Sequence, residues 1–137
     1  EEVITMLNPL FKKNNANIYL NAKSDIYLNL DYLRMKQVLV NVLKNALEAK
    51  KEDEQLNVRV EVKKTRNNIK IIIEDNGIGM DKNTLERITE IFYTTKASGN
   101  GLGVVLSKEI IEMHNGTINY KSTLGKGTTV TITLPNK

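Results

Sequence analysis

The sequence predicts an α+β domain, a two-layer α/β sandwich with helices on one face of a mixed, mostly antiparallel sheet. Apolar and polar residues alternate over 56–62, 69–75 and 128–134, which is the period of strands with one buried face. Apolar residues recur every three or four positions over 3–11, 31–51 and 102–113, which predicts helices. Because strands and helices do not alternate strictly along the chain, we expect one helical layer on one sheet face.

Composition fits a single globular domain of 137 residues, with 40% hydrophobic and 26% charged residues. The apolar runs are far too short to span a membrane. The net charge of +4 suits an anionic nucleotide, and since basic and acidic residues are interleaved, nucleic acid is not an expected partner. The absence of cysteine excludes disulfides and thiolate zinc sites. We expect a cytoplasmic location, whether or not the parent protein is membrane-anchored.

The first half should hold a helix, two short strands and a long buried helix. Alternation over 18–22 and 26–30 predicts the strands, and Asp31 is a candidate N-cap for a helix reaching about Lys51. Pro9 is expected to kink the first helix. One face of that helix should carry the apolar residues Val3, Met6, Leu7, Leu10 and Phe11.

The second half should hold two hairpins and two helices, which brings the expected total to six strands and three main helices. The first hairpin joins 56–62 to 69–75, and the last joins 118–120 to 128–134. Between them we expect a short helix over 81–91 capped by Asp81. A longer helix from Leu102 should end at Asn115-Gly116, a favoured C-terminal signal.

The run Asp75-Asn76-Gly77-Ile78-Gly79-Met80 is the most informative motif. Asp75 continues the phase of the preceding strand, so its carboxylate is aimed at the core side, where an ionised acid needs a partner. One interpretation is a turn residue that caps Asn76-Gly77. The other is a ligand acceptor, with Gly77 and Gly79 allowing the backbone to pass close to a bound group.

Two further segments strengthen the ligand interpretation. Asn41 and Asn45 lie four residues apart, hence on one face of a helix, and amides in an apolar helix need partners. These partners could be structural or could belong to a ligand. The glycine-rich run 99–103 opens a helix, where backbone N–H groups and the helix dipole favour an anion. An ordinary flexible loop is the alternative there.

Together the three segments resemble the asparagine box, glycine boxes and lid of the superfamily shared by DNA gyrase, the ninety-kilodalton heat-shock chaperone, sensor histidine kinases and mismatch-repair MutL. The run 41–49 and Tyr93-Thr-Thr-Lys96 resemble histidine kinases of the nitrogen-regulation and sporulation type. The resemblance covers nearly the whole chain. It implies the Bergerat (histidine-kinase ATPase) fold with a left-handed βαβ unit, a junction over 1–13 to a missing dimerisation and phosphoacceptor domain, and an ATP lid over 80–101.

The resemblance also implies the roles of individual residues. Asp75 would accept the amine of adenine, Asn45 would bind Mg²⁺, and Asn41 and Lys96 would lie beside the phosphates. Phe92 would anchor the lid, although plain core packing is the alternative, and a solvated position is the alternative for Lys96. The catalytic residues would be Asn41, Asn45 and Lys96. The remaining nucleotide contacts would come from Ala49, Gly77, Ile78, Gly79, Met80, Thr94, Thr95, Gly99, Asn100, Gly101, Leu102, Gly103, Val104 and Thr128, with Thr128 or Thr129 near the phosphates.

Asn41 discriminates among the relatives, because hydrolysing members carry a glutamate at that position and asparagine cannot serve as a general base. The resemblance therefore implies a kinase that donates the γ-phosphoryl group of Mg·ATP to a histidine on the dimerisation helix, and through it to a response regulator. The parent should be a homodimer, while the fragment need not be. An anti-sigma-type serine kinase, a gyrase-like ATPase and a nucleotide-holding pseudokinase are the alternatives.

Some residues depart from the family pattern or invite a different role. Ile91 stands where the family usually has proline before the aromatic pair of the lid, so lid rigidity is in question. His114 lies in the last turn of a predicted helix without the acidic neighbour and proline of a phosphoacceptor, so we interpret it as structural.

Overall fold

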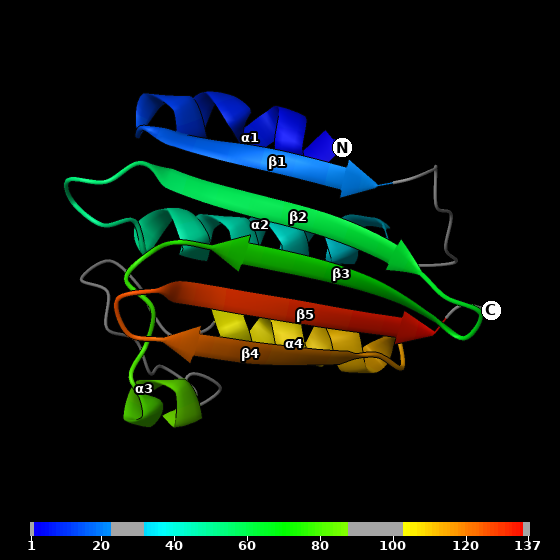
Figure 1. The fold of residues 1–137 in the computed structure, drawn as a ribbon. Helices are drawn as coiled ribbons and strands as arrows, with labels where there is room; N and C mark the ends of the chain where they lie inside the picture. The colour runs from blue at the N-terminus through cyan, green and yellow to red at the C-terminus, as the bar shows by residue number, and fades with distance from the viewer. Residues whose placement is uncertain (1, 23–31, 88–102, 136–137) are drawn as a thin grey trace.

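The computed structural model describes residues 2–22, 32–87 and 103–135. These residues form five strands and four helices in a two-layer arrangement (Figure 1). The strands are β1 (Ala16–Ala22), β2 (Leu56–Lys64), β3 (Asn68–Asp75), β4 (Thr117–Thr123) and β5 (Gly127–Pro135). The helices are α1 (Glu2–Lys13), α2 (Tyr32–Glu48), α3 (Lys82–Arg87) and α4 (Gly103–Met113). The strand expected at 26–30 and its neighbour Asp31 lie outside the described residues.

The sheet has the order β1-β2-β3-β5-β4. Only β1 and β2 run parallel, and the other neighbours are antiparallel, so the expected mixed sheet is confirmed. Figure 1 views the sheet from the face that the helices leave uncovered, with α2 and α4 behind it. Because of the antiparallel pairing, the ends of β3 and β4 and the starts of β2 and β5 lie at the same end of the sheet.

The connection from β1 through α2 to β2 has the uncommon hand. In Figure 1, β1 lies above β2, both run in the same direction, and α2 lies behind them, which makes the crossover left-handed. Nearly all crossovers between parallel strands in one sheet are right-handed. The left-handed βαβ unit implied by the resemblance is therefore present.

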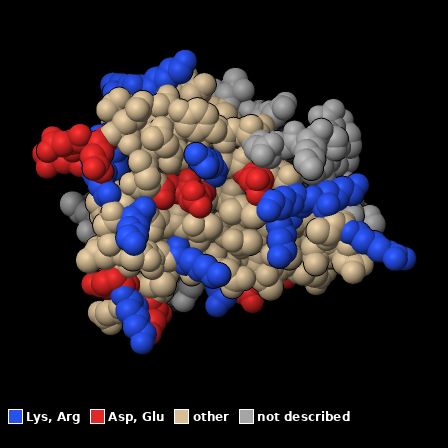
Figure 2. All heavy atoms as spheres, in the orientation of Figure 1, with Lys and Arg blue, Asp and Glu red and all other residues tan. Residues whose placement is uncertain are grey.

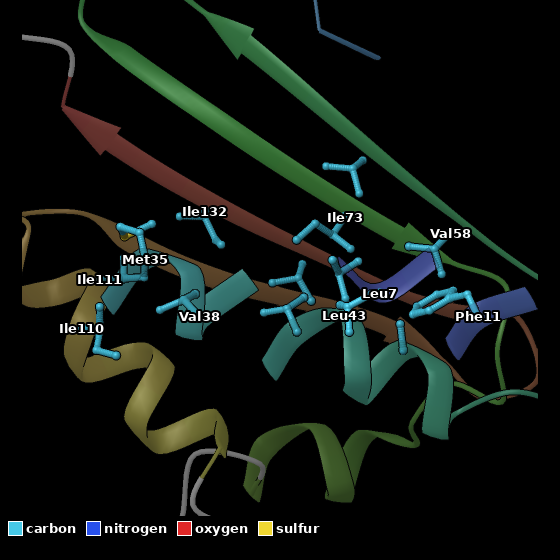
Figure 3. Packing of buried hydrophobic residues seen from close by; sticks show 14 of the residues in the cluster. Leu7, Phe11, Met35, Val38, Leu43, Val58, Ile73, Ile110, Ile111 and Ile132 are labelled. Carbon is cyan, nitrogen blue, oxygen red and sulfur yellow. The ribbon is translucent and has the colours of Figure 1, made fainter. Parts of the chain in front are cut away.

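The core fills the space between the sheet and its helices (Figure 3). Helix α2 contributes Val38 and Leu43, α4 contributes Ile110 and Ile111, and the strands cover them from the other side. The strand residues in this cluster include Val58, Ile73, Val130, Ile132 and Leu134. Their alternation in the sequence is thus an alternation in burial, as strand geometry requires. Among the described helices, none is long and apolar enough to cross a membrane.

Helix α1 packs on the core by a narrower face than its sequence suggested. Leu7 is 4% exposed and Phe11 is fully buried, whereas Met6 and Leu10 are 47% and 39% exposed. Met6 and Leu10 lie at the exposed border of the apolar face that the sequence predicted. Ile4 packs against the core instead, because it lies one turn before Leu7. Pro9 lies inside α1, which runs on to Lys13.

We expect α1 to be an integral part of the domain. Phe11→Ala should lower the free energy of unfolding by about 3–5 kcal/mol, because it removes a fully buried ring. Met6→Ala on the same helix should change it by no more than about 0.5 kcal/mol. Urea unfolding followed by circular dichroism measures both. Similar losses in the two variants would contradict this placement of the helix.

Candidate nucleotide-binding site

Asp75 ends β3 with its carboxylate on the helix side of the sheet, as its phase predicted. The residue is 8% exposed. Its Oδ1 accepts two backbone hydrogen bonds, from the N–H of Gly77 at 2.9 Å and from the N–H of Thr128 at 3.3 Å. Its Oδ2 makes no hydrogen bond within the described part of the chain. The backbone therefore holds one oxygen of the carboxylate and leaves the other available to a ligand.

The environment of Asp75 changes its acidity. Burial raises the pKa of this carboxyl above its usual range, and the hydrogen bonds from Gly77 and Thr128 lower it by less. The neighbouring Glu74 adds to the rise. A carboxylate with a raised pKa gains most from a new donor, because that donor stabilises the charged form which burial disfavours.

The loop after Asp75 is attached to the end of α2 by backbone contacts. The N–H of Ile78 donates to the carbonyl oxygen of Ala49 at 2.7 Å. A side chain at position 77 would meet the same oxygen, since a Cβ built there lies 2.5 Å from it. Gly77 is thus needed for close packing between the loop and the helix end, in addition to any room it leaves for a ligand.

The turn between β4 and β5 is attached to the same loop. The N–H of Gly125 donates to the carbonyl oxygen of Ile78 at 2.6 Å, and Nζ of Lys51 donates to the carbonyl oxygen of Gly125 at 2.6 Å. Lys51 also pairs with Glu54 at 3.3 Å. Three connections that are far apart in the sequence therefore meet around Ile78, which is 47% exposed and presents an apolar side chain there.

Ser122 on β4 joins three of these segments through one hydroxyl group. Its Oγ accepts the N–H of Met80 at 2.7 Å and donates to the carbonyl oxygen of Gly127 at 3.0 Å. The same Oγ lies 2.8 Å from Oγ1 of Thr128. Ser122 and Thr128 are register partners, and Asp75 is next to Thr128 on the other side. Asp75, Thr128 and Ser122 thus form a row across three strands.

Asn41 and Asn45 lie on the side of α2 that faces α4. Arg34 shares this side with them by the helical repeat, and its Nη1 lies 3.6 Å from Sδ of Met113 at the end of α4. Both asparagines are half-buried, as expected for residues that flank the core face. Since α2 and α4 run antiparallel, the later residue Asn45 lies toward the start of α4.

The start of α4 adds an anion-favouring feature to this end of the molecule. Gly103 is the first residue of α4 and Val104 the second, so their N–H groups belong to the first turn, which has no hydrogen-bond partners within the helix itself. The helix dipole places partial positive charge there. The asparagine pair, the α4 N-terminus and the carboxylate of Asp75 all lie on the helix side of the sheet, as a site for a base and its phosphates requires.

The described residues contain part of the predicted site. Asp75, Gly77, Ile78, Gly79, Met80, Ala49 and Thr128 come together at the end of the sheet, and Asn41, Asn45, Gly103 and Val104 belong to the two neighbouring helices. The predicted contacts Phe92, Thr94, Thr95, Lys96, Gly99, Asn100, Gly101 and Leu102, together with most of the lid at 80–101, lie outside the described residues. Within the described ranges, no group of three or more His, Cys, Asp or Glu residues could hold a metal ion.

Of the two threonines expected near the phosphates, Thr128 lies beside Asp75 on the helix side. Thr129 is opposite in phase and lines a groove of about 500 Å³ on the uncovered sheet face. Arg59, Glu74 and Lys121 line that groove as well, and Asp75, Ser122 and Thr128 also border it. Figure 2 shows basic and acidic side chains interspersed over this face. Asn41, Asn45 and the described start of α4 do not line this groove, so the predicted residues gather mainly on the helix side of the sheet.

The sequence did not reveal the hydrogen bonds of Ser122 and Lys51, or those that Asn76 makes to the start of β2. Oδ1 of Asn76 accepts the N–H of Asn57 at 2.7 Å, and its Nδ2 donates to the carbonyl oxygen of Gln55 at 3.2 Å. These bonds fix the start of β2 beside the end of β3. A usable signal for Ser122 was its phase, because it follows Ile118 and Tyr120 on the inward side of β4. His114 follows the last residue of α4, and its Nδ1 lies 2.8 Å from the carbonyl oxygen of Ile110, which agrees with a structural interpretation.

This fold and site define an ATPase-type domain. The family model described as "Histidine kinase-, DNA gyrase B-, and HSP90-like ATPase" matches residues 30–137. The chain belongs to this family. Its sequence relatives include sensor protein DegM of Bacillus sp. (strain B21-2), 35% identical, with 98% of this chain and 35% of the relative covered. Sporulation kinase B of Bacillus subtilis is 34% identical, with 98% and 34% covered.

A third relative, sensor protein kinase WalK of Staphylococcus aureus, is 40% identical over 82% of this chain and 29% of its own length. The chain thus spans about a third of these curated relatives. Among solved structures, the catalytic domain of histidine kinase ThkA superposes with a TM-score of 0.86 at 25% identity, covering 98% of this chain and 89% of that one. The mycobacterial sensor histidine kinase MprB shares the fold, with a TM-score of 0.81 at 21% identity and coverage of 98% and 92%.

Gly127 should be essential for the local geometry at Asp75. It has φ of 123°, and a Cβ there would collide with the carbonyl oxygen of Asp75. Gly125, with φ of 84°, offers a matched control because a Cβ there meets nothing within 4 Å. Gly127→Ala should lower the free energy of unfolding by about 1–3 kcal/mol more than Gly125→Ala, measured by urea unfolding. Equal losses would show that backbone strain alone matters at both positions.

Proposed function

We propose that this domain binds Mg·ATP and donates the γ-phosphoryl group to a histidine on a dimerisation domain of the same parent protein, in two-component signalling. The observation that carries the proposal is the carboxylate of Asp75, in which Oδ1 accepts two backbone hydrogen bonds and Oδ2 accepts none from the described residues. The asparagine pair and the N-terminus of α4 lie on the same side of the sheet. Membership of the ATPase family and the similarity to sensor and sporulation kinases support it. A response regulator would then receive the phosphoryl group from that histidine.

Recognition of adenine would rest on Oδ2 of Asp75. The carboxylate presents lone pairs only, which suits the exocyclic amine of adenine and disfavours the carbonyl at the same position of guanine or hypoxanthine. Gly77 and Gly79 allow the loop to pack closely against the carbonyl oxygens of Ala49 and Thr123. The exposed apolar side chain of Ile78 on this loop would offer a surface for a base.

Mg²⁺ would enter with the nucleotide. Asn45 would supply one neutral oxygen, and phosphates and water would complete the octahedral set that the ion prefers. The ion, when bound, would neutralise charge on the phosphates.

Transfer to a protein side chain is favoured over hydrolysis because of Asn41. An amide side chain does not remove a proton from water, so the site would position and neutralise ATP until another nucleophile arrives. The chemistry would then consist mainly of positioning and charge stabilisation, as is general for phosphoryl transfer.

Asp75→Asn should leave the fold intact and weaken ATP binding by about tenfold or more. The amide oxygen can keep both backbone hydrogen bonds, while the amide nitrogen replaces Oδ2 and presents a donor to the adenine amine. Calorimetry on the folded variant measures the affinity, with Glu74→Gln as a neighbouring control that removes a charge facing away. Unchanged ATP affinity in the variant would contradict the assignment of Asp75 as the acceptor of the adenine amine.

Asn45→Ala should reduce phosphoryl transfer more than it reduces ATP affinity, because the ion acts mainly on the charge that develops during transfer.

The nucleotide-free protein should bind Mg²⁺ no more tightly than about the millimolar range, since Asn45 is a single neutral ligand. Titration calorimetry with Mg²⁺, with and without ADP, measures both states. Submillimolar binding of the ion without nucleotide would contradict this metal site.

The isolated domain should hydrolyse ATP very slowly and should not label itself. Mixed with a matching dimerisation domain and labelled ATP, it should give a phosphohistidine that is labile in acid and stable in base. Label on serine would point to the anti-sigma type of kinase. Brisk ATP turnover without an acceptor would point to a gyrase-like ATPase.

A further inference from the structure

Oγ of Ser122 has three polar neighbours, and their chemistry fixes where its proton goes. A hydroxyl has one proton and two lone pairs. The carbonyl oxygen of Gly127 can only accept, so it takes the proton of Ser122. The N–H of Met80 can only donate, so it occupies one lone pair. The second lone pair is left for Thr128, whose hydroxyl must then be the donor in the 2.8 Å contact.

This arrangement uses the single proton of the Thr128 hydroxyl. Its Oγ1 then has only lone pairs to offer to anything else that approaches. Thr128 is opposite Asp75 across β3 and β5, and its own N–H bonds to Oδ1 of Asp75 at 3.3 Å. The hydroxyl of Thr128 and the available Oδ2 of Asp75 therefore belong to the same end of the site, on the same sheet face.

We propose that Ser122 is a positioning residue for base selection: it orients the Thr128 hydroxyl as an acceptor, so that Asp75 and Thr128 together present only acceptors to the base. Such a pair suits the two N–H donors of an adenine amine in direct contact, and opposes a carbonyl at that position. The inference rests on the proposed function, because it concerns the nucleotide bound at Asp75.

Ser122 also connects this polarity to the loop after Asp75. Its bond to the N–H of Met80 links β4 to the segment that carries Gly77 and Ile78. Without the Ser122 hydroxyl, Thr128 could rotate its proton toward the ligand and donate to a carbonyl. Selectivity between an amine and a carbonyl would then fall, while the carboxylate of Asp75 would stay in place.

The test compares the affinities of the domain for ATP and for inosine triphosphate, which carries a carbonyl in place of the amine. In Ser122→Ala the ratio of the two affinities should fall by about two- to tenfold, mainly because inosine triphosphate binds more tightly. Ser122→Thr, which keeps a hydroxyl, should retain the wild-type ratio. Thr131→Val, on the same strand as Thr128 but on the other face, is a matched control that should also retain it.

A double-variant cycle separates this role from a structural one. In a Thr128→Val background, Ser122→Ala should leave the ratio unchanged, because Ser122 acts through the Thr128 hydroxyl. Equal weakening of both nucleotides in Ser122→Ala would overturn the proposal. If Ser122→Ala does not fold, Thr128→Val should still lower the ratio and Thr128→Ser should keep it; an unchanged ratio in Thr128→Val would overturn the proposal as well. Failure of the proposed function looks different, since the wild-type domain would bind neither nucleotide.

Discussion

The site depends on the hydrogen bonds that the backbone makes to one of the two carboxylate oxygens of Asp75. Two N–H groups, from the loop that follows β3 and from the neighbouring strand β5, hold Oδ1, and Oδ2 is left for a ligand. Burial raises the pKa of this group, so the folded protein keeps its proton to a higher pH than the unfolded chain does. Its contribution to stability therefore falls as pH rises through that range. A bound donor would offset this cost, which couples the stability of the domain to occupancy of the site.

The fold supplies this geometry by bringing distant segments to one sheet end. The antiparallel pairs β3–β5 and β4–β5 place Asp75, Thr128 and Ser122 in a row, and the left-handed crossover puts α2 behind β2 with its C-terminus near the same end. Ala49, Ile78 and Gly125 then join the three connections through backbone hydrogen bonds. Close approach of backbones explains why glycine is required at 77 and 127, where a Cβ would meet a carbonyl oxygen.

Local periodicity was enough to predict the five strands that the structure describes, the helices α2 and α4 and the inward direction of Asp75, because each follows from residues close in sequence. The same holds for the shared helix face of Asn41 and Asn45. The bonds of Ser122 and Lys51 were not predictable, because their partners are distant in the sequence. Ser122 is 42 residues from Met80, and Lys51 is 74 residues from Gly125, so both bonds depend on strand register and turn geometry. Spacing alone placed Met6 and Leu10 on the apolar face of α1, and it could not show that they lie at the exposed border of that face.

In the proposed complex, Oδ2 of Asp75 receives the base amine while Oδ1 keeps its backbone hydrogen bonds. A crystal structure of the domain with Mg²⁺ and a non-hydrolysable ATP analogue tests it most directly. We expect the adenine amine within about 3 Å of Oδ2, with the N–H groups of Thr128 and Gly77 still bonded to Oδ1. A base bound elsewhere, for example in the groove beside Arg59 and Lys121, with Oδ2 facing solvent, would contradict it.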